Sequence, residues 1–343
     1  MTLREFIHFC IERLSPLYPE PEAKAIAFRL LEHYTDIPSY KYISEPDLVI
    51  ALPVTPGASP SVMPGLTGHL APQARSPKAH SEPSVAAGTR NEEPRMLHQA
   101  DAREPAPLSS VMPGPDRVSE MMDALLALEK GRPLQYVLGV TEFCGHRFKV
   151  REGCLIPRPE TEELVSRIID ELSGKEIGEE PFNILDIGTG SGCIAWSLAA
   201  AFPEAMVYGC DRSNDALSIA CKQRVKVGGA KPIFFWADVL SAPPAGLPMF
   251  DVIVSNPPYI CDSERAAMRP NVLDYEPAEA LFVPDDDPLR FYTAIARWAD
   301  ALLRSDGRIY LEINDRFAPA VAALFPGSAV HPDLFGRSRF VIR

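Results

Sequence analysis

Three segments near the start of the chain, residues 3–14, 23–34 and 118–130, carry apolar side chains every three to four positions. This spacing places them on one face of a helix, which a small domain buries against its neighbours. The third segment ends at Gly131, a residue suited to a helix C-terminus. The apolar positions of the three segments are Leu3, Phe6, Ile7, Cys10, Ile11, Leu14, Ile26, Ala27, Leu30, Leu31, Met122, Leu125 and Leu126.

The stretch between the second and third helical segments has a different character. Residues 52–116 are rich in proline, with Ala, Ser, Gly and mixed charge, and they show no hydrophobic period. Such a composition cannot bury enough apolar surface to offset the entropy of ordering the chain. We therefore expect a disordered insertion that divides a helical, substrate-docking domain into residues 1–51 and 117–131.

The remaining chain alternates between strand-like and helical patterns. Residues 132–154 suggest a two-stranded β-hairpin connector with its turn at 143–148. A helix begins near Pro159, followed by acidic residues that suit its first turn. Beyond it, short apolar runs at 182–187, 206–210, 233–236, 252–254 and 309–313 are separated by helical stretches. This alternation predicts an α/β domain, residues 155–343, with a doubly wound parallel sheet.

Composition narrows the class of protein. The formal net charge of −12 gives no general attraction to nucleic acid or to an anionic membrane. The seven cysteines are scattered, with no Cys-x-x-Cys pair, so we expect reduced thiols and no metal site. Charged residues interrupt the N-terminus, and no apolar run is long enough to cross a bilayer. These features predict a cytoplasmic protein.

A glycine-rich turn and three aspartates suggest a ligand site. Asp186-Ile187-Gly188-Thr189-Gly190-Ser191-Gly192 joins a strand to a helix, where glycines let a ligand approach backbone N–H groups. Cys193 stands where a dinucleotide fingerprint needs its third glycine. Asp211, some twenty residues beyond the glycines, suits a ribose, and Asp238 suits the amine of an adenine. Asp186 suits a cationic group, so the ligand that fits is S-adenosylmethionine.

A second motif ends another strand. Residues 250–255 form an apolar run that stops at Asn256-Pro257-Pro258-Tyr259, at the sheet edge where α/β folds bind ligands. The Asn256 amide, the free proline carbonyls and the flat ring of Tyr259 could hold a planar amide or amine. In isolation the same residues could be a strand-ending turn without chemistry.

These motifs together resemble the PrmC/HemK family of protein-glutamine methyltransferases. The matching segments are Leu155-Ile-Pro-Arg-Pro-Glu-Thr-Glu162, residues 186–192 and 256–259, Arg132-Pro-Leu-Gln-Tyr136, Tyr275-Glu-Pro-x-x-Ala-Leu281 and Gly336-Arg-Ser-Arg-Phe340. The resemblance implies a class I S-adenosylmethionine-dependent methyltransferase fold, Rossmann-like, with an antiparallel C-terminal hairpin. It also implies methylation of the glutamine side-chain amide in the Gly-Gly-Gln loop of class I peptide chain release factors, by a monomer.

The resemblance assigns roles to individual residues. Catalysis would rest on Asn256, Pro257 and Tyr259. The substrate would contact Asn256, Pro257, Pro258 and Tyr259. The cofactor would contact Asp186, Ile187, Gly188, Thr189, Gly190, Asp211, Asp238, Val239 and Asn256.

The chain departs from the family at three places. Pro288 stands where the family usually has a glycine. Asn314-Asp315-Arg316 follows the strand that ends in Leu311-Glu312, where the family usually has Gly and Gln. The proline-rich insertion interrupts the docking domain. Two other functions stay open. An adenine-N6 DNA or RNA methyltransferase could use the same Asn-Pro-Pro-Tyr motif, but would need a basic face and a target-reading domain. A cofactor-binding scaffold without catalysis is disfavoured by the intact motif.

Overall fold

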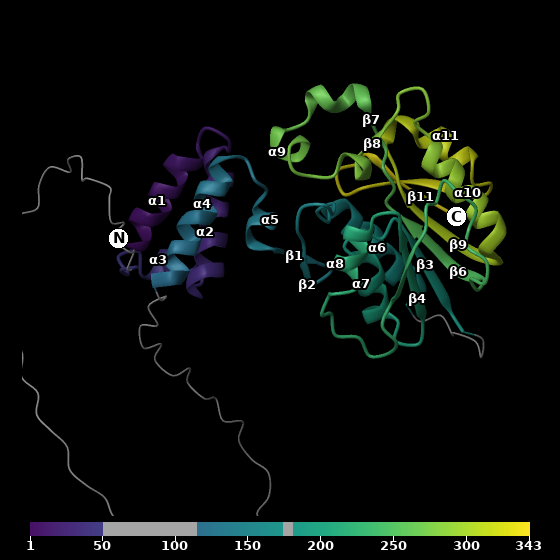
Figure 1. The fold of residues 1–343 in the computed structure, drawn as a ribbon, viewed down its shortest axis with the longest axis horizontal. Helices are drawn as coiled ribbons and strands as arrows, with labels where there is room; N and C mark the ends of the chain where they lie inside the picture. Colours follow the sequence, from purple (N-terminus) through teal and green to yellow (C-terminus); the bar gives the residue numbers. More distant parts are fainter. Residues whose placement is uncertain (51–114, 174–180) are drawn as a thin grey trace, which may run out of the picture.

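The computed structural model describes residues 1–50, 115–173 and 181–343. Its N-terminal body is helical (Figure 1). The helices are α1 (Leu3–Leu14), α2 (Glu20–Thr35), α3 (Lys41–Ser44) and α4 (Pro115–Glu129). The first helix begins with a capping box, in which Thr2 and Glu5 each accept a hydrogen bond from the other's backbone N–H.

One hydrophobic core joins α1, α2 and α4, although α4 follows the others by some eighty residues. Its members include Phe6 and Ile7 from α1, Leu30 from α2, and Met121 and Leu125 from α4. Most of the proposed insertion, 52–116, lies outside the described residues. Its proposed end is corrected, because α4 begins at Pro115. The division of the chain into domains otherwise stays a proposal.

A short connector leads from this body to the sheet. It contains α5 (Leu134–Leu138), β1 (Val140–Phe143) and β2 (His146–Lys149), the two strands being antiparallel. The turn lies at Cys144 and Gly145, which both have positive φ, as a tight hairpin requires. The sequence pattern suggested strands alone, so the helical turn α5 is a correction; Pro133, with φ near −56°, precedes its start.

In the described ranges the main sheet has seven strands. Its spatial order is β10-β11-β9-β6-β3-β4-β5, and β11 runs antiparallel to both β9 and β10. Every other neighbouring pair is parallel. This confirms the predicted Rossmann-like sheet with its antiparallel C-terminal hairpin. The bounds are β3 (Asn183–Ile187), β4 (Met206–Asp211), β5 (Ile233–Trp236), β6 (Phe250–Ser255), β9 (Leu303–Glu312), β10 (Ala329–Pro332) and β11 (Ser338–Ile342).

Helices cover both faces of this sheet. On one face α6 (Pro159–Leu172) and α7 (Cys193–Ala201) pack on β3 and β6 through residues such as Leu164, Ile184 and Val252. On the other, α10 (Arg290–Leu302) and α11 (Ala318–Ala323) pack through Trp298, Ile253 and Val341. Alternate residues of β6 thus reach opposite cores, so the central strands are apolar throughout, as buried parallel strands are. The helix α8 (Asn214–Ala220) follows β4.

A long excursion follows β6 and lies toward the helical body (Figure 1). It comprises β7 (Ile260–Cys261), η1 (Asp262–Ala267), α9 (Pro270–Leu273), η2 (Ala278–Ala280) and β8 (Phe282–Val283). A further 3-10 helix, η3 (Asp315–Phe317), lies outside this excursion and follows β9. The Tyr275 hydroxyl donates to the Lys130 carbonyl at 3.0 Å, and Arg269 pairs with Glu22 at 3.1 Å. These contacts join the two bodies. No helix within the described ranges has the length and apolar character to cross a membrane.

Candidate active site

The glycine-rich turn between β3 and α7 has a backbone that only glycine adopts readily. Gly188 and Gly190 both have positive φ, of 73° and 55°. The N–H groups of Gly188 and Thr189 both donate to the Cys210 carbonyl at 2.9 Å, which holds the turn against the end of β4. A Cβ added at Gly188 would meet no heavy atom within 4 Å, so the turn borders open space that a ligand could fill.

Asp186 lies behind this turn. It is fully buried, and its Oδ2 accepts hydrogen bonds from Thr189 Oγ1 at 2.6 Å and from Ala195 N at 3.2 Å. Its other oxygen, Oδ1, is buried and has no hydrogen-bond partner in the described structure. Burial raises the pKa of this carboxyl from 3.8 to about 7, against the lowering effect of the two hydrogen bonds. The carboxyl therefore shapes the turn, and it does not line the adjoining pocket.

The buried carboxyl predicts a pH effect on the ligand-free protein. A folded-state pKa above the unfolded value adds stability at low pH, and this stability is lost as pH rises through the folded value. Relative to Asp186→Asn, the wild-type free energy of unfolding should fall by about 1 kcal/mol from pH 6 to pH 8. Urea denaturation of both proteins at the two pH values measures it. A difference independent of pH would contradict the raised pKa.

Two other carboxylates stand at the carboxyl ends of neighbouring strands. Asp211, the last residue of β4, accepts hydrogen bonds from Gly190 N at 2.9 Å and Ser213 N at 2.8 Å. Burial raises the pKa of its carboxyl, while these backbone donors lower it. Asp238, just past β5, accepts from Leu240 N at 2.9 Å. Each carboxylate is thus held in place by backbone N–H groups.

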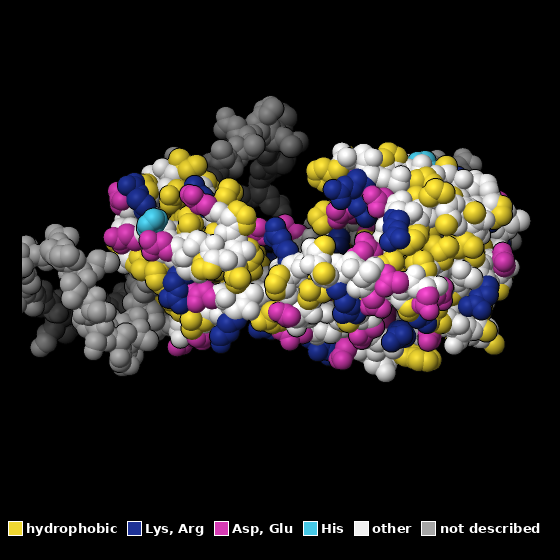
Figure 2. All heavy atoms as spheres, turned by 90° about the horizontal axis from the view of Figure 1, so that it is seen from above, with side chains coloured by type: hydrophobic (Ala, Val, Ile, Leu, Met, Phe, Trp, Pro, Cys, Tyr) yellow, Lys and Arg dark blue, Asp and Glu magenta, His cyan; other side chains and the backbone are white. Residues whose placement is uncertain are grey.

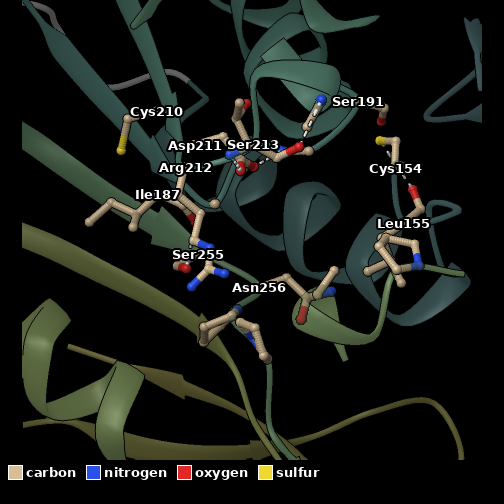
Figure 3. Close-up of a pocket in the computed structure, with 18 of the residues that line it drawn as sticks. Cys154, Leu155, Ile187, Ser191, Cys210, Asp211, Arg212, Ser213, Ser255 and Asn256 are labelled. Atoms are coloured by element: carbon tan, nitrogen blue, oxygen red, sulfur yellow. Dashed lines mark hydrogen bonds between the residues drawn. The ribbon is translucent and has the colours of Figure 1, made fainter. Parts of the chain in front are cut away.

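One pocket brings most of the expected residues together. Figure 3 shows Ile187 and Asp211 on one side and Asn256 across from them, with Cys154 and Leu155 at a third side. The expected residues that line it are Ile187, Gly188, Thr189, Gly190, Asp211, Asp238, Val239, Asn256, Pro257 and Pro258. Asp186 and Tyr259 do not line it, so direct contact of either with a ligand stays a prediction.

The Asn-Pro-Pro-Tyr segment is held from several sides. Ser255 Oγ donates to the Ile187 carbonyl at 2.7 Å, which ties the end of β6 to the end of β3. Asn256 Nδ2 donates to Thr161 Oγ1 at 2.8 Å. The Tyr259 carbonyl accepts from Asn314 Nδ2 at 3.2 Å, so Asn314, at a position where the chain departs from the family pattern, supports this segment.

The hydroxyl of Tyr259 is engaged in a hydrogen bond within the protein. It donates to Glu312 Oε1 at 2.9 Å, and burial raises its pKa well above the ordinary value. The phenol therefore stays protonated at neutral pH. Because the hydroxyl anchors the ring to the end of β9, the side chain can rotate little. This fixed ring is compatible with stacking on a planar group but is no proton acceptor.

Several pocket residues received no individual role from the sequence, although the segment 155–162, which contains four of them, was quoted for the family resemblance. Arg158 lines the pocket, and its Nη2 donates to Glu276 Oε1 at 2.6 Å. Glu276 Oε2 accepts from Ile156 N at 3.1 Å, joining this segment to residues 270–280. The remaining lining residues of this kind include Cys154, Leu155, Thr161, Ser213, Ser255 and Phe291.

The residues present fit S-adenosylmethionine. Asp211 offers a carboxylate to a ribose, and Asp238 stands beside the apolar Ala237 and Val239, a combination suited to an adenine ring and its amine. The open turn at 188–190 admits a chain close to the backbone, beside the Asn256 amide. The site therefore pairs a nucleoside-binding edge with a group suited to a planar amide.

Comparison with known proteins agrees with this geometry. Residues 168–272 match the family model of the methyltransferase small domain. A release factor glutamine methyltransferase of Bacteroides thetaiotaomicron is 43% identical over 227 residues, 65% of this chain and 79% of the relative. The release factor glutamine methyltransferase of Flavobacterium psychrophilum is 42% identical, and the match covers 63% of this chain and 77% of the relative. The enzyme of the same name from Cereibacter sphaeroides is 38% identical, and the match covers 72% of this chain and 88% of the relative. The chain belongs to the release factor glutamine methyltransferase family, and the resemblance seen in its motifs is confirmed.

Proposed function

We propose that this protein transfers a methyl group from S-adenosylmethionine to the side-chain amide nitrogen of a glutamine in peptide chain release factors. The observation that carries the proposal is the position of Asn256. Its amide lines the same pocket as Asp211, Asp238 and the glycine-rich turn. A planar amide acceptor thus lies beside the groups that suit the cofactor, in a chain whose relatives are named for this reaction.

The chemistry requires precise placement of a weak nucleophile. An amide nitrogen reacts poorly because its lone pair is delocalised into the carbonyl. The bound cofactor supplies an electrophilic methyl group. Asn256 Oδ1 and the Pro257 carbonyl accept the two hydrogens of the substrate NH₂, which aligns the nitrogen and stabilises the positive charge that develops on it. Tyr259 packs on the amide plane. The N–C bond forms as the S–C bond to the methyl breaks, with its electron pair staying on sulfur, and the surplus proton on the nitrogen passes to water. No strong general base is needed, because the nitrogen becomes acidic only as it is methylated.

The substrate glutamine belongs, in this proposal, to the Gly-Gly-Gln loop of class I release factors. The surface charge supports a protein substrate over a nucleic acid. On the face in Figure 2, Lys and Arg side chains are interspersed with Asp and Glu and form no basic face. The formal charge of −12 likewise gives no general attraction to a polynucleotide. The protein acts as a monomer in the cytoplasm, where its substrate works. The relatives named for glutamine methylation give the adenine-N6 alternative no support.

The test is transfer of a labelled methyl group. Purified release factor, its variant with the Gly-Gly-Gln glutamine changed to alanine, and DNA and RNA are each incubated with enzyme and labelled cofactor. We expect label in the unaltered release factor alone, and peptide mapping should place it on that glutamine. Label in nucleic acid, or in the alanine variant, would overturn the proposal.

Asp211→Ala should separate binding from chemistry. The proposed carboxylate contact with the ribose is a charged hydrogen bond, worth roughly 1.5–3 kcal/mol, and lies away from the reacting methyl. We expect cofactor affinity to fall about tenfold to a hundredfold, while turnover at saturating cofactor changes much less. Calorimetric titration beside steady-state kinetics measures both. Unchanged affinity would remove Asp211 from the site.

A further inference from the structure

A buried carboxylate stands behind Asn256, outside the pocket itself. Glu312 ends β9 and is 1% exposed. Its Oε2 accepts from Thr161 Oγ1 at 2.6 Å and its Oε1 accepts from the Tyr259 hydroxyl at 2.9 Å. Its backbone carbonyl accepts from the Tyr292 hydroxyl at 3.1 Å. Three hydroxyl groups therefore converge on one residue, and two of them point their protons at its carboxylate.

The fold places this carboxylate in line with Asn256. Strands β6 and β9 are parallel neighbours, and Ser255 is in register with Leu311. Asn256 directly follows Ser255 at the end of β6, and Glu312 follows Leu311 as the last residue of β9, so both lie at the same sheet edge. Thr161, in the first turn of α6 and 3% exposed, lies between them. The three residues come from segments up to 151 positions apart.

The direction of each hydrogen bond follows from proton count. Burial raises the pKa of the Glu312 carboxyl, while the hydrogen bonds from Thr161 and Tyr259 and the charge of Arg339 lower it. A hydroxyl has one proton, and Thr161 donates that proton to Glu312 Oε2 at 2.6 Å, the direction that an ionised carboxylate requires. Toward Asn256, Thr161 Oγ1 can then only accept. Asn256 must therefore present Nδ2 to Thr161, at 2.8 Å. Its carbonyl oxygen, Oδ1, is left on the other side of the same planar group.

We propose that Thr161 and Glu312 are positioning residues that fix the orientation of the Asn256 amide and so keep its carbonyl available for the substrate. The proposal rests on the function proposed above, in which the substrate NH₂ donates to Asn256. An amide has nearly the same shape when its oxygen and nitrogen are exchanged, so packing alone distinguishes the two orientations poorly. In a flipped Asn256 the NH₂ group would face the substrate NH₂, so two donors would meet and the substrate would lose its acceptor.

The experiment is a double-mutant cycle. Thr161→Val keeps the shape of the side chain and removes its hydroxyl, Thr161→Ser keeps the hydroxyl, and Asn256→Ala removes the amide that is to be oriented. The four enzymes of the cycle, namely wild type, Thr161→Val, Asn256→Ala and the double variant, are assayed with labelled cofactor at saturation. Thr161→Ser is assayed beside them. Calorimetric cofactor affinity and thermal melting are measured for all.

If the inference is right, Thr161→Val lowers kcat about tenfold, the effect of one lost hydrogen bond, while Thr161→Ser stays within about twofold of wild type. In the Asn256→Ala background the same substitution should change kcat by less than about twofold, since no amide remains to be oriented. Cofactor affinity should be preserved within about threefold in Thr161→Val, because the proposed ribose and adenine contacts are made by Asp211 and Asp238, which the substitution leaves in place.

Two results would overturn the inference. Equal tenfold losses in both backgrounds would mean that Thr161 supports the fold and does not act through Asn256. No loss in Thr161→Val would mean that the hydroxyl is not needed at all. The proposed function fails separately, when Asn256→Ala retains full activity or the wild-type enzyme does not label release factor.

Discussion

Replacing Asn256 by alanine should lower kcat for release factor methylation by about a hundredfold to a thousandfold, the loss typical of one group that stabilises developing charge. The amide carbonyl is proposed to hold the substrate nitrogen in line with the methyl and to bind it more strongly as it becomes positive. The loss therefore falls on the transition state. Turnover at saturating cofactor and release factor is the measurement, with calorimetric cofactor affinity beside it.

The matched comparison is Asp211→Ala, which should show the reverse pattern, with affinity lost and turnover largely kept. Asn256→Asp tests whether the shape of the side chain is enough, because aspartate has nearly the shape of asparagine but lacks its NH₂ donor. An aspartate keeps an acceptor but cannot donate to Thr161, and it places a second carboxylate two hydrogen bonds from Glu312. We expect it to be no more active than alanine. Near wild-type turnover of Asn256→Ala would leave the Asn-Pro-Pro-Tyr segment as a rigid strand end without a catalytic role.

Elements fixed by local pattern could be predicted from the sequence. The strand at 233–236 has the bounds that its apolar run indicates, and the helix expected after the glycine-rich turn is present as α7. The glycine-rich turn and Asn256 follow strands that are parallel neighbours, so their meeting at one sheet edge could be inferred from the alternation of elements. Motif spacing excluded a dinucleotide fingerprint because Cys193 replaces a glycine. The family assignment followed from these motifs.

The contacts that orient the site could not be predicted in this way. Thr161 and Glu312 lie 151 positions apart, and no local signal says that a threonine in a first helical turn meets a carboxylate at a strand end. The sequence suggested Asp186 as a ligand contact but not its burial behind the turn, which the structure shows; the contact itself stays a prediction. Position along the chain gives the strand that a side chain follows, but packing decides which way the side chain points.

Removing the guanidinium of Arg158 should destabilise the methyltransferase domain by about 2–3 kcal/mol. Its partner Glu276 has a side chain only 1% exposed, while that of Arg158 is 30% exposed. Arg158→Ala leaves a buried carboxylate supported mainly by the N–H of Ile156, at 3.1 Å. Full loss of a partner from a buried pair costs about 3–5 kcal/mol, and the remaining N–H and the partial exposure of Arg158 reduce that figure.

Tryptophan fluorescence during urea unfolding measures this loss, because all three tryptophans, Trp196, Trp236 and Trp298, lie in the methyltransferase domain. The control is Arg269→Ala, which breaks an ion pair whose arginine is 64% exposed and should cost less than about 1 kcal/mol. In Arg158→Met/Glu276→Gln no charge is left buried, so most of the stability should return. If that double variant is as unstable as Arg158→Ala, the arginine acts through packing, and the ion pair is not what joins the 155–162 segment to residues 270–280.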